Sequence, residues 1–131
     1  MRSRNRRWSA SGVPVLKVGS PSECVKGSAH SALRATAALA RRYDVPLVIH
    51  LAETEDEVKT SQTEHKLTPT AYLESLGFWG PKTLAAHGVW MTDDDIAILK
   101  RRQVGVSHNP ESNMKLASGV APVGKYLAAG V

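Results

Sequence analysis

The stretch Val45-Pro46-Leu47-Val48-Ile49-His50-Leu51-Ala52-Glu53-Thr54 decides the predicted fold. An apolar, β-branched run leads into His50, and the carboxylate of Glu53 follows three positions later. Thr54 and Glu57 then form the sequence signature of a helix start. This order is typical of a buried parallel strand that delivers polar groups to the open end of an α/β sheet.

Two later segments repeat the pattern, because the apolar runs at residues 84–87 and 104–108 also end in a histidine. Helical spacing and capping residues predict helices between and around the strands, at residues 31–43, 54–62, 68–77, 93–102 and 122–129. Residues 109–121 are predicted to be a loop. Alternating strands and helices predict a parallel α/β fold, either a doubly wound sheet or a (β/α)8 barrel.

The 131 residues suffice for one domain, and their net charge of +5 is unevenly spread. Residues 1–42 hold nine Lys and Arg against one acid. Up to Lys26 these cations sit among Ser, Gly and Pro, so we expect residues 1–30 to be an irregular basic segment, with 13–18 a candidate short strand. We therefore expect no nucleic-acid partner.

Two further features of the composition limit the location of the protein. No apolar run approaches the roughly 18 residues of a membrane span, so no membrane association is expected. The single cysteine, Cys24, excludes an internal disulfide framework. It predicts a reducing compartment, and hence a cytoplasmic location.

The three strand-end histidines are the candidate site, because functional groups collect at the C-terminal ends of parallel strands. His50 is a candidate metal ligand, Glu53 a candidate proton carrier, and His87 could orient water or stabilise charge. A lone strand-end histidine is more often structural, and Glu53 could instead be a first-turn acid that favours the helix dipole. That second interpretation suits Glu57 better. His108, Ser112 and Asn113 are expected to brace a loop beside the site.

Three segments carry a family resemblance: PLVIHLAETEDEV (46–58), TLAAHGVWMTDDDIAIL (83–99) and VGVSHNPESNMKLASGVAPVGKYLAAGV (104–131). They resemble the metal-dependent amidohydrolase superfamily, above all its methylthioadenosine/S-adenosylhomocysteine deaminases and triazine chlorohydrolases. The similarity covers about residues 31–131. It implies a (β/α)8 barrel of which the three predicted strands are the fifth, sixth and seventh.

The resemblance also implies roles for individual residues. His50 matches a ligand of zinc or another divalent metal, and Glu53 matches the glutamate that contacts the purine and shuttles the proton. His87 matches a histidine beside the activated water, so Glu53 and His87 are the expected catalytic and substrate-binding residues. His108, Ser112 and Asn113 match a mostly architectural signature. The implied reaction is hydrolytic deamination, in which a metal-activated water adds to a ring carbon and ammonia leaves.

The sequence departs from the family pattern at the other metal ligands. It contains no His-x-His pair, His30 lacks the strand-four context, and the strand-eight aspartate would fall beyond Val131. We therefore expect a partial barrel, with His50 alone of the usual ligands, that is inactive by itself. Two alternatives stay open: an N-heterocycle (triazine-type) chlorohydrolase or aminohydrolase, or a non-catalytic α/β module that binds a partner. Exposed sheet edges could also support an oligomer.

Overall fold

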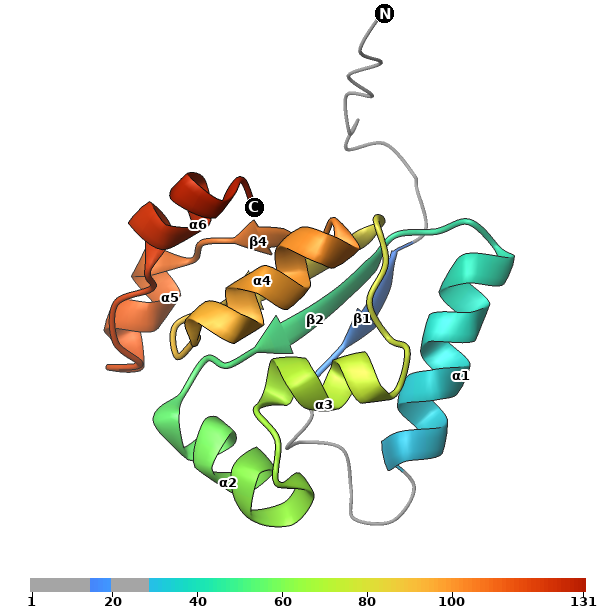
Figure 1. Cartoon of the computed structure of the whole chain (residues 1–131), viewed down its shortest axis with the longest axis horizontal. Helices are drawn as coiled ribbons and strands as arrows, with labels where there is room; N and C mark the ends of the chain where they lie inside the picture. Colours follow the sequence, from blue (N-terminus) through green and yellow to red (C-terminus); the bar gives the residue numbers. More distant parts are fainter. Residues whose placement is uncertain (1–14, 20–28) are drawn as a thin grey trace, which may run out of the picture.

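A parallel sheet of four strands organises the computed structural model, which describes residues 15–19 and 29–131. The strands lie side by side in chain order, and each pairs in parallel with the next (Figure 1): β1 Leu16–Val18, β2 Leu47–Leu51, β3 Thr83–His87 and β4 Gly105–Ser107. The register sets Val48 beside Leu84, and His50 beside Ala86. The predicted parallel α/β architecture is confirmed.

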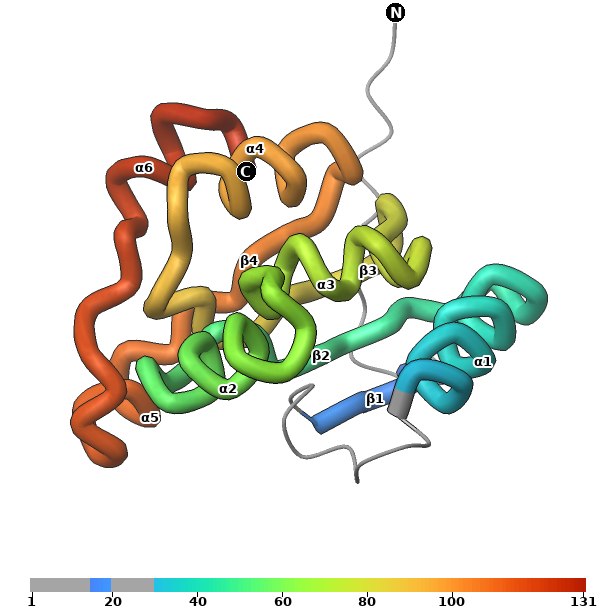
Figure 2. The backbone as a smooth tube through the Cα atoms, turned by 60° about the horizontal axis from the view of Figure 1, so that its bottom comes forward, coloured from blue at the N-terminus to red at the C-terminus, as the bar shows by residue number. Residues whose placement is uncertain are grey.

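One or two helices follow each strand, and they run from α1 at one end of the sheet to α5 and α6 at the other (Figure 2). Their bounds are α1 Ala29–Arg42, α2 Glu55–His65, α3 Pro69–Ser75, α4 Asp93–Arg102, α5 Pro110–Lys115 and α6 Val123–Ala129. None of the helices in the described part of the chain combines the length and the apolar character that a membrane crossing needs.

Local sequence signals explain where the longer connecting helices begin. The Thr92 side chain accepts the N–H of Asp95 while the Asp95 carboxylate accepts the N–H of Thr92, so α4 starts with a complete capping box. Helix α4 also carries acids in its first turn and bases in its last, which suits the helix dipole. Thr68 caps α3, whose first position is Pro69.

The core lies on one face of the sheet. Leu47, Ile49 and Leu51 alternate along β2 and are buried. They belong to one apolar cluster with residues of the helices, including Leu33 of α1, Leu73 of α3 and Leu99 of α4. Each such side chain contributes about 1.5–3 kcal/mol through burial. Val48 and His50 point to the opposite face and are more exposed, so the described helices cover one face of this sheet and leave the other more open.

Strand β1 lies within residues 13–18, the candidate short strand of the N-terminal segment, and it pairs with β2 over three residues. Two expectations need correction. Helix α5 occupies part of the predicted loop 109–121, because Pro110 is preorganised for the first helical position. Helix α2 continues to His65, beyond the expected end at residue 62. Cys24 and the basic residues up to Arg7 lie outside the described residues.

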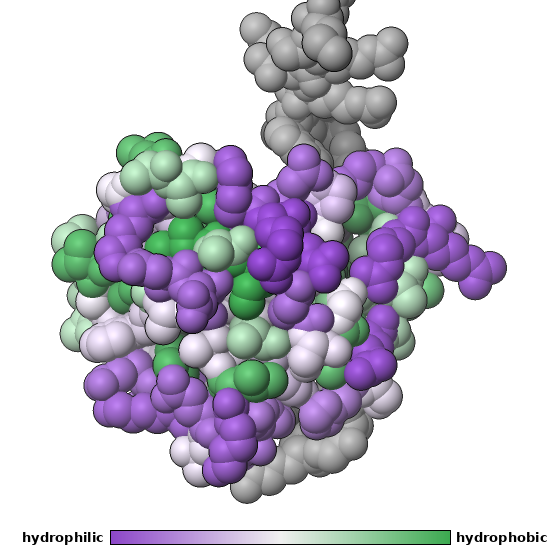
Figure 3. Space-filling view, viewed as in Figure 1, coloured by the Kyte–Doolittle hydropathy of each residue, from purple (hydrophilic) through white to green (hydrophobic). Residues whose placement is uncertain are grey.

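Exposed apolar side chains gather around the last two helices. Space-filling Figure 3 shows hydrophobic surface at the left edge of the molecule, over α5 and α6. The exposed residues of this region include Met114, Leu116, Val120 and Leu127. We assign no function to this surface.

Candidate functional site

The turn between β2 and α2 carries the candidate carboxylate. Ala52 adopts a left-handed conformation with φ of 47°, which directs the chain sharply out of the strand. The N–H groups of Ala52 and Glu53 both donate to the carboxylate of Glu57, at 2.8 and 3.0 Å. The hydroxyl of Thr54 accepts the N–H of Glu57. This turn is therefore held by hydrogen bonds that belong to neither the strand nor the helix.

The turn after β3 carries His87 and is bonded to the first turn. His87 and Gly88 have φ of 77° and 54°. The N–H groups of Val89 and Trp90 donate to the carbonyl of Ala52, each at 3.0 Å. The hydroxyl of Tyr126 in α6 donates to the carbonyl of Gly88. Burial and the charge of Asp95 raise the pKa of Tyr126, so this hydroxyl stays protonated and remains a donor.

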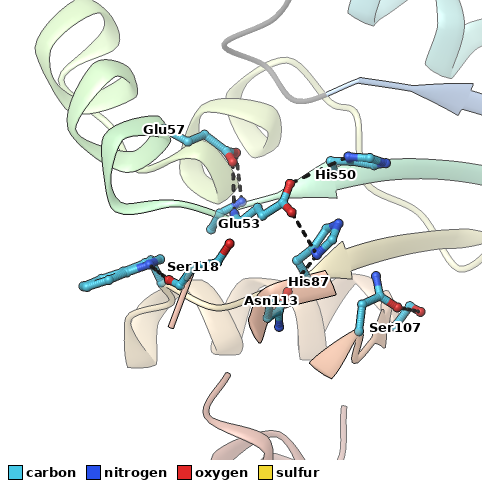
Figure 4. Close-up of polar contacts among 10 residues, drawn as sticks. His50, Glu53, Glu57, His87, Ser107, Asn113 and Ser118 are labelled. Carbon is cyan, nitrogen blue, oxygen red and sulfur yellow. Dashed lines mark hydrogen bonds and ion pairs between the residues drawn. The ribbon is translucent and has the colours of Figure 1, made fainter. Parts of the chain in front are cut away.

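These two turns bring His50, Glu53 and His87 together at the C-terminal ends of β2 and β3 (Figure 4). One carboxylate oxygen of Glu53 lies 3.4 Å from Nδ1 of His87, and the other lies 4.0 Å from Nδ1 of His50. The two imidazole rings have centroids 5.1 Å apart. The side chains are 51%, 16% and 6% exposed for His50, Glu53 and His87, so the group runs from solvent into the protein.

Asn113 contacts the ring of His87. Its Oδ1 lies 2.9 Å from Nδ1 of His87, and the carboxylate of Glu53 approaches the same nitrogen. Both neighbours present oxygen atoms to Nδ1, so an N–H at this position would find an acceptor in either of them. The Nδ2 of Asn113 is buried and has no hydrogen-bond partner among the described residues.

The donor set of this group fits a divalent metal. His50, Glu53 and His87 each offer one ligand atom, and these atoms lie within 4.8 Å of one another. Two imidazoles and a carboxylate are a common ligand set of catalytic zinc, which leaves one position open for water or substrate. His50 and His87 would hold the ion, and the carboxylate of Glu53 is close enough to bind it or to move protons beside it.

The structure unites some of the sequence-derived candidates and separates others. His50, Glu53 and His87 converge, and Asn113 contacts the group. His108 is exposed and Ser112 is half-buried on α5, and both lie outside the group of three. The remaining described histidines, His30 and His65, pack on Tyr72 instead.

Sequence reasoning missed two residues that shape the site. Glu57 was interpreted as an acid that favours the helix dipole, yet its carboxylate binds the turn of Glu53. Tyr126 lies 38 residues from the glycine that it contacts. The capping pattern from Thr54 to Glu57 was a signal for the first residue, although it pointed to the wrong N–H groups. No local signal marks the second.

Comparison with known proteins shows which family this chain resembles. Residues 14–131 match the amidohydrolase family, so the similarity begins before residue 31 and includes β1. A 5′-deoxyadenosine deaminase of Methanothermobacter thermautotrophicus is 52% identical over 99 residues, which are 76% of this chain and 23% of the relative. A 5-methylthioadenosine/S-adenosylhomocysteine deaminase of Carboxydothermus hydrogenoformans is 54% identical over 92 residues, 70% of this chain and 21% of the relative.

Solved structures of similar enzymes also match this chain. An adenosine deaminase from Xanthomonas campestris with bound zinc matches with a TM-score of 0.81 and 31% identity, over 88% of this chain and 25% of that one. The zinc complex of atrazine chlorohydrolase from Arthrobacter aurescens matches with a TM-score of 0.72 and 28% identity, over 78% of this chain and 22% of that one. The expectation of a partial barrel fold is thereby confirmed. The chain spans about a fifth to a quarter of the length of the curated relatives it matches.

Proposed function

This chain belongs to the amidohydrolase family, and we propose that it carries part of the active site of a zinc-dependent deaminase of purine nucleosides. The observation that carries the proposal is the convergence of His50, Glu53 and His87 at the ends of two adjacent parallel strands. Support comes from the relatives of about 50% identity, which are named as deaminases of 5′-deoxyadenosine and of methylthioadenosine or S-adenosylhomocysteine.

We assign a proton-transfer role to Glu53. Its carboxylate lies between the two imidazoles and is 16% exposed, so it can meet a substrate while it is partly shielded from water. It would take a proton from the attacking water and deliver it to a ring nitrogen or to the departing amino group. A nucleoside deaminase needs such a transfer, because ammonia is a far better leaving group than an amide ion.

We assign binding and orienting roles to the histidines. His50 would be a ligand of the metal, which when bound supplies Lewis-acid stabilisation of developing negative charge. His87 is engaged through Nδ1 by Asn113, so Nε2 is the ring nitrogen that we assign to the reactants. That nitrogen can accept a hydrogen bond or serve as a further ligand.

We expect the 131-residue chain alone not to deaminate nucleosides. Half of the His50 side chain is exposed, and the uncovered sheet face beside it gives solvent access to the site. Catalysis at such a site needs shielding from bulk solvent, which the uncovered sheet face does not provide. The activity is therefore assigned to a chain in which further strands complete the site.

Zinc binding tests the site in the chain as it stands. We expect equilibrium dialysis to show one zinc ion bound per chain, and His50→Ala to weaken binding by more than the roughly 10- to 100-fold that loss of an outer contact costs. His108→Ala is the matched control, because His108 also follows a strand but lies outside the group. Equal zinc affinities of the two variants would disprove the His50 assignment.

A chimera tests the reaction. Residues 31–131 of this chain would replace the matching segment of the Methanothermobacter deaminase, and the products of 5′-methylthioadenosine, S-adenosylhomocysteine and atrazine would be measured. We expect deamination of the nucleosides, and a fall in kcat of about 10²- to 10⁴-fold for Glu53→Gln at unchanged zinc content. Glu55→Gln, an exposed acid of the same turn, should leave kcat unchanged. Dechlorination of atrazine without nucleoside deamination would favour the triazine alternative.

A further inference from the structure

Glu57 is an unusual acid for the first turn of a helix. Of the three acids in the first turn of α2, Glu55 and Asp56 are exposed, whereas Glu57 is only 6% exposed. Favourable interaction with the helix dipole requires no burial, and burying a carboxylate is costly unless it is hydrogen-bonded. The position of Glu57 therefore needs a second explanation.

The carboxylate of Glu57 binds the backbone of the residue that we expect to move protons. Oε1 accepts the N–H of Ala52 and Oε2 accepts the N–H of Glu53. Both N–H groups lie between the last residue of β2 and Thr54, the N-cap of α2, so neither the sheet nor the helix can satisfy them. Ala52 also has φ of 47°, a conformation that alanine rarely adopts without such support.

The opposite side of the same peptide is also bonded. The carbonyl of Ala52 accepts the N–H groups of Val89 and Trp90 from the turn that follows His87. Glu57 thus completes a set of bonds that joins the turn of Glu53 to the turn of His87. The Glu53 carboxylate lies 3.4 Å from His87 within this frame.

We propose that Glu57 is the positioning residue of Glu53, whose buried carboxylate holds the turn at residues 52–53 so that the Glu53 side chain faces His50 and His87. The inference rests on the proposed function only for the proton-transfer role of Glu53. Glu57 does not act on substrate itself, because its side chain is buried and its carboxylate is directed at backbone N–H groups. It is also outside the group of potential ligands.

The chemistry of the bonds explains why glutamate is needed. The two N–H groups each meet a different oxygen of Glu57, and a carboxylate places an acceptor atom at both of these positions. The amide of Gln would turn an NH2 group towards one donor. An aspartate keeps both oxygens but is one methylene shorter, so it should hold the turn less well. Glu57→Gln and Glu57→Asp therefore separate acceptor chemistry from side-chain length.

Nuclear magnetic resonance of the 131-residue chain, without metal or substrate, tests this inference. In the wild type we expect slow exchange of the Ala52 and Glu53 amides and a nuclear Overhauser contact between the Glu53 side chain and the His87 ring. Glu57→Gln should speed exchange of those two amides at least about tenfold and abolish the contact, because the bonds to the carboxylate no longer oppose opening. Glu57→Asp should restore part of both signals.

The controls separate positioning from a general effect on folding. Glu55→Gln should match the wild type, and exchange in β3 should stay unchanged in all variants. Four results would overturn the inference: wild-type amides without protection, unchanged exchange in Glu57→Gln, a persisting contact, or equally faster exchange throughout α2 and the sheet. The last would make Glu57 a helix-start acid. Because the experiment uses no metal or substrate, its result can be interpreted even if the deaminase assignment is wrong.

Discussion

At the scale of single residues, Gly88 leaves no room for a side chain. A Cβ at this position would lie 2.6 Å from the Tyr126 hydroxyl, and φ is 54°. We expect Gly88→Ala to lower the free energy of unfolding by about 2–5 kcal/mol, the sum of a left-handed alanine and overpacking. Gly77→Ala is the control, because Gly77 has φ of 67° but nothing within 4 Å. Urea denaturation that gives equal losses at both glycines would contradict the packing of Tyr126 against Gly88.

The candidate residues show which part of a site can be predicted from sequence. His50, Glu53 and His87 follow apolar strands, and the ends of parallel strands meet at one edge, so their convergence follows from the local pattern. The contact of Asn113 with His87 spans 26 residues and depends on where α5 packs. The resemblance pointed to Asn113 as a loop residue, but only the structure identifies its partner.

At the scale of elements, an ion-pair cluster joins α3 to α4. The Glu74 carboxylate accepts hydrogen bonds from Arg102 at 2.9 Å and from Arg101 at 3.2 Å. The bond to Arg102 is the main cause that lowers the pKa of Glu74 below its ordinary value of 4.5. Since the pKa is lower in the folded state, the stabilisation is present above the unfolded pKa and is lost as pH falls through the folded one.

We therefore expect the effect of Glu74→Gln to depend on pH. At pH 7 the loss in free energy of unfolding should reach about 1 kcal/mol at most, because the arginines are largely exposed and solvent screens the pair. At pH 3 the variant and the wild type should unfold at nearly the same urea concentration. Glu55→Gln, which breaks an exposed pair with Lys59 inside α2, should cost only about 0.3–0.5 kcal/mol. A loss for Glu74→Gln that is equal at both pH values would point to packing rather than charge.

The start of a helix could be predicted where capping residues mark it. It could not be predicted where tertiary packing sets the boundary. Thr92 and Asp95 marked the start of α4, and the structure shows both reciprocal bonds. Thr54 and Glu57 gave the same signal for α2, but Glu57 bends back to Ala52 and Glu53. A capping pattern thus predicts that a helix starts, while the partner of its carboxylate depends on the preceding turn.

At the scale of the whole molecule, the described residues leave the sheet with one covered and one open face. The alternation of β2 shows this directly, because Leu47, Ile49 and Leu51 are buried and Val48 and His50 are more exposed. The parallel order was predictable from alternating strands and helices. An apolar strand has the same sequence pattern whether one face or both faces of its sheet are covered. The uncovered face could therefore be expected only through the family resemblance, which implied a partial barrel.

Substitutions on the two faces of the sheet test that asymmetry. Leu84 lies beside Val48 on the open face and is 39% exposed, whereas Ile49 is fully buried against the helices. In the 131-residue chain we expect Ile49→Ala to lower the free energy of unfolding by about 2–5 kcal/mol, and Leu84→Ala by less than about 1 kcal/mol. In the chimera with the Methanothermobacter deaminase the open face would become barrel interior, so Leu84→Ala should then cost about as much as Ile49→Ala. If Leu84→Ala costs the same small amount in both chains, the added strands do not cover this face and the site beside His50 stays open.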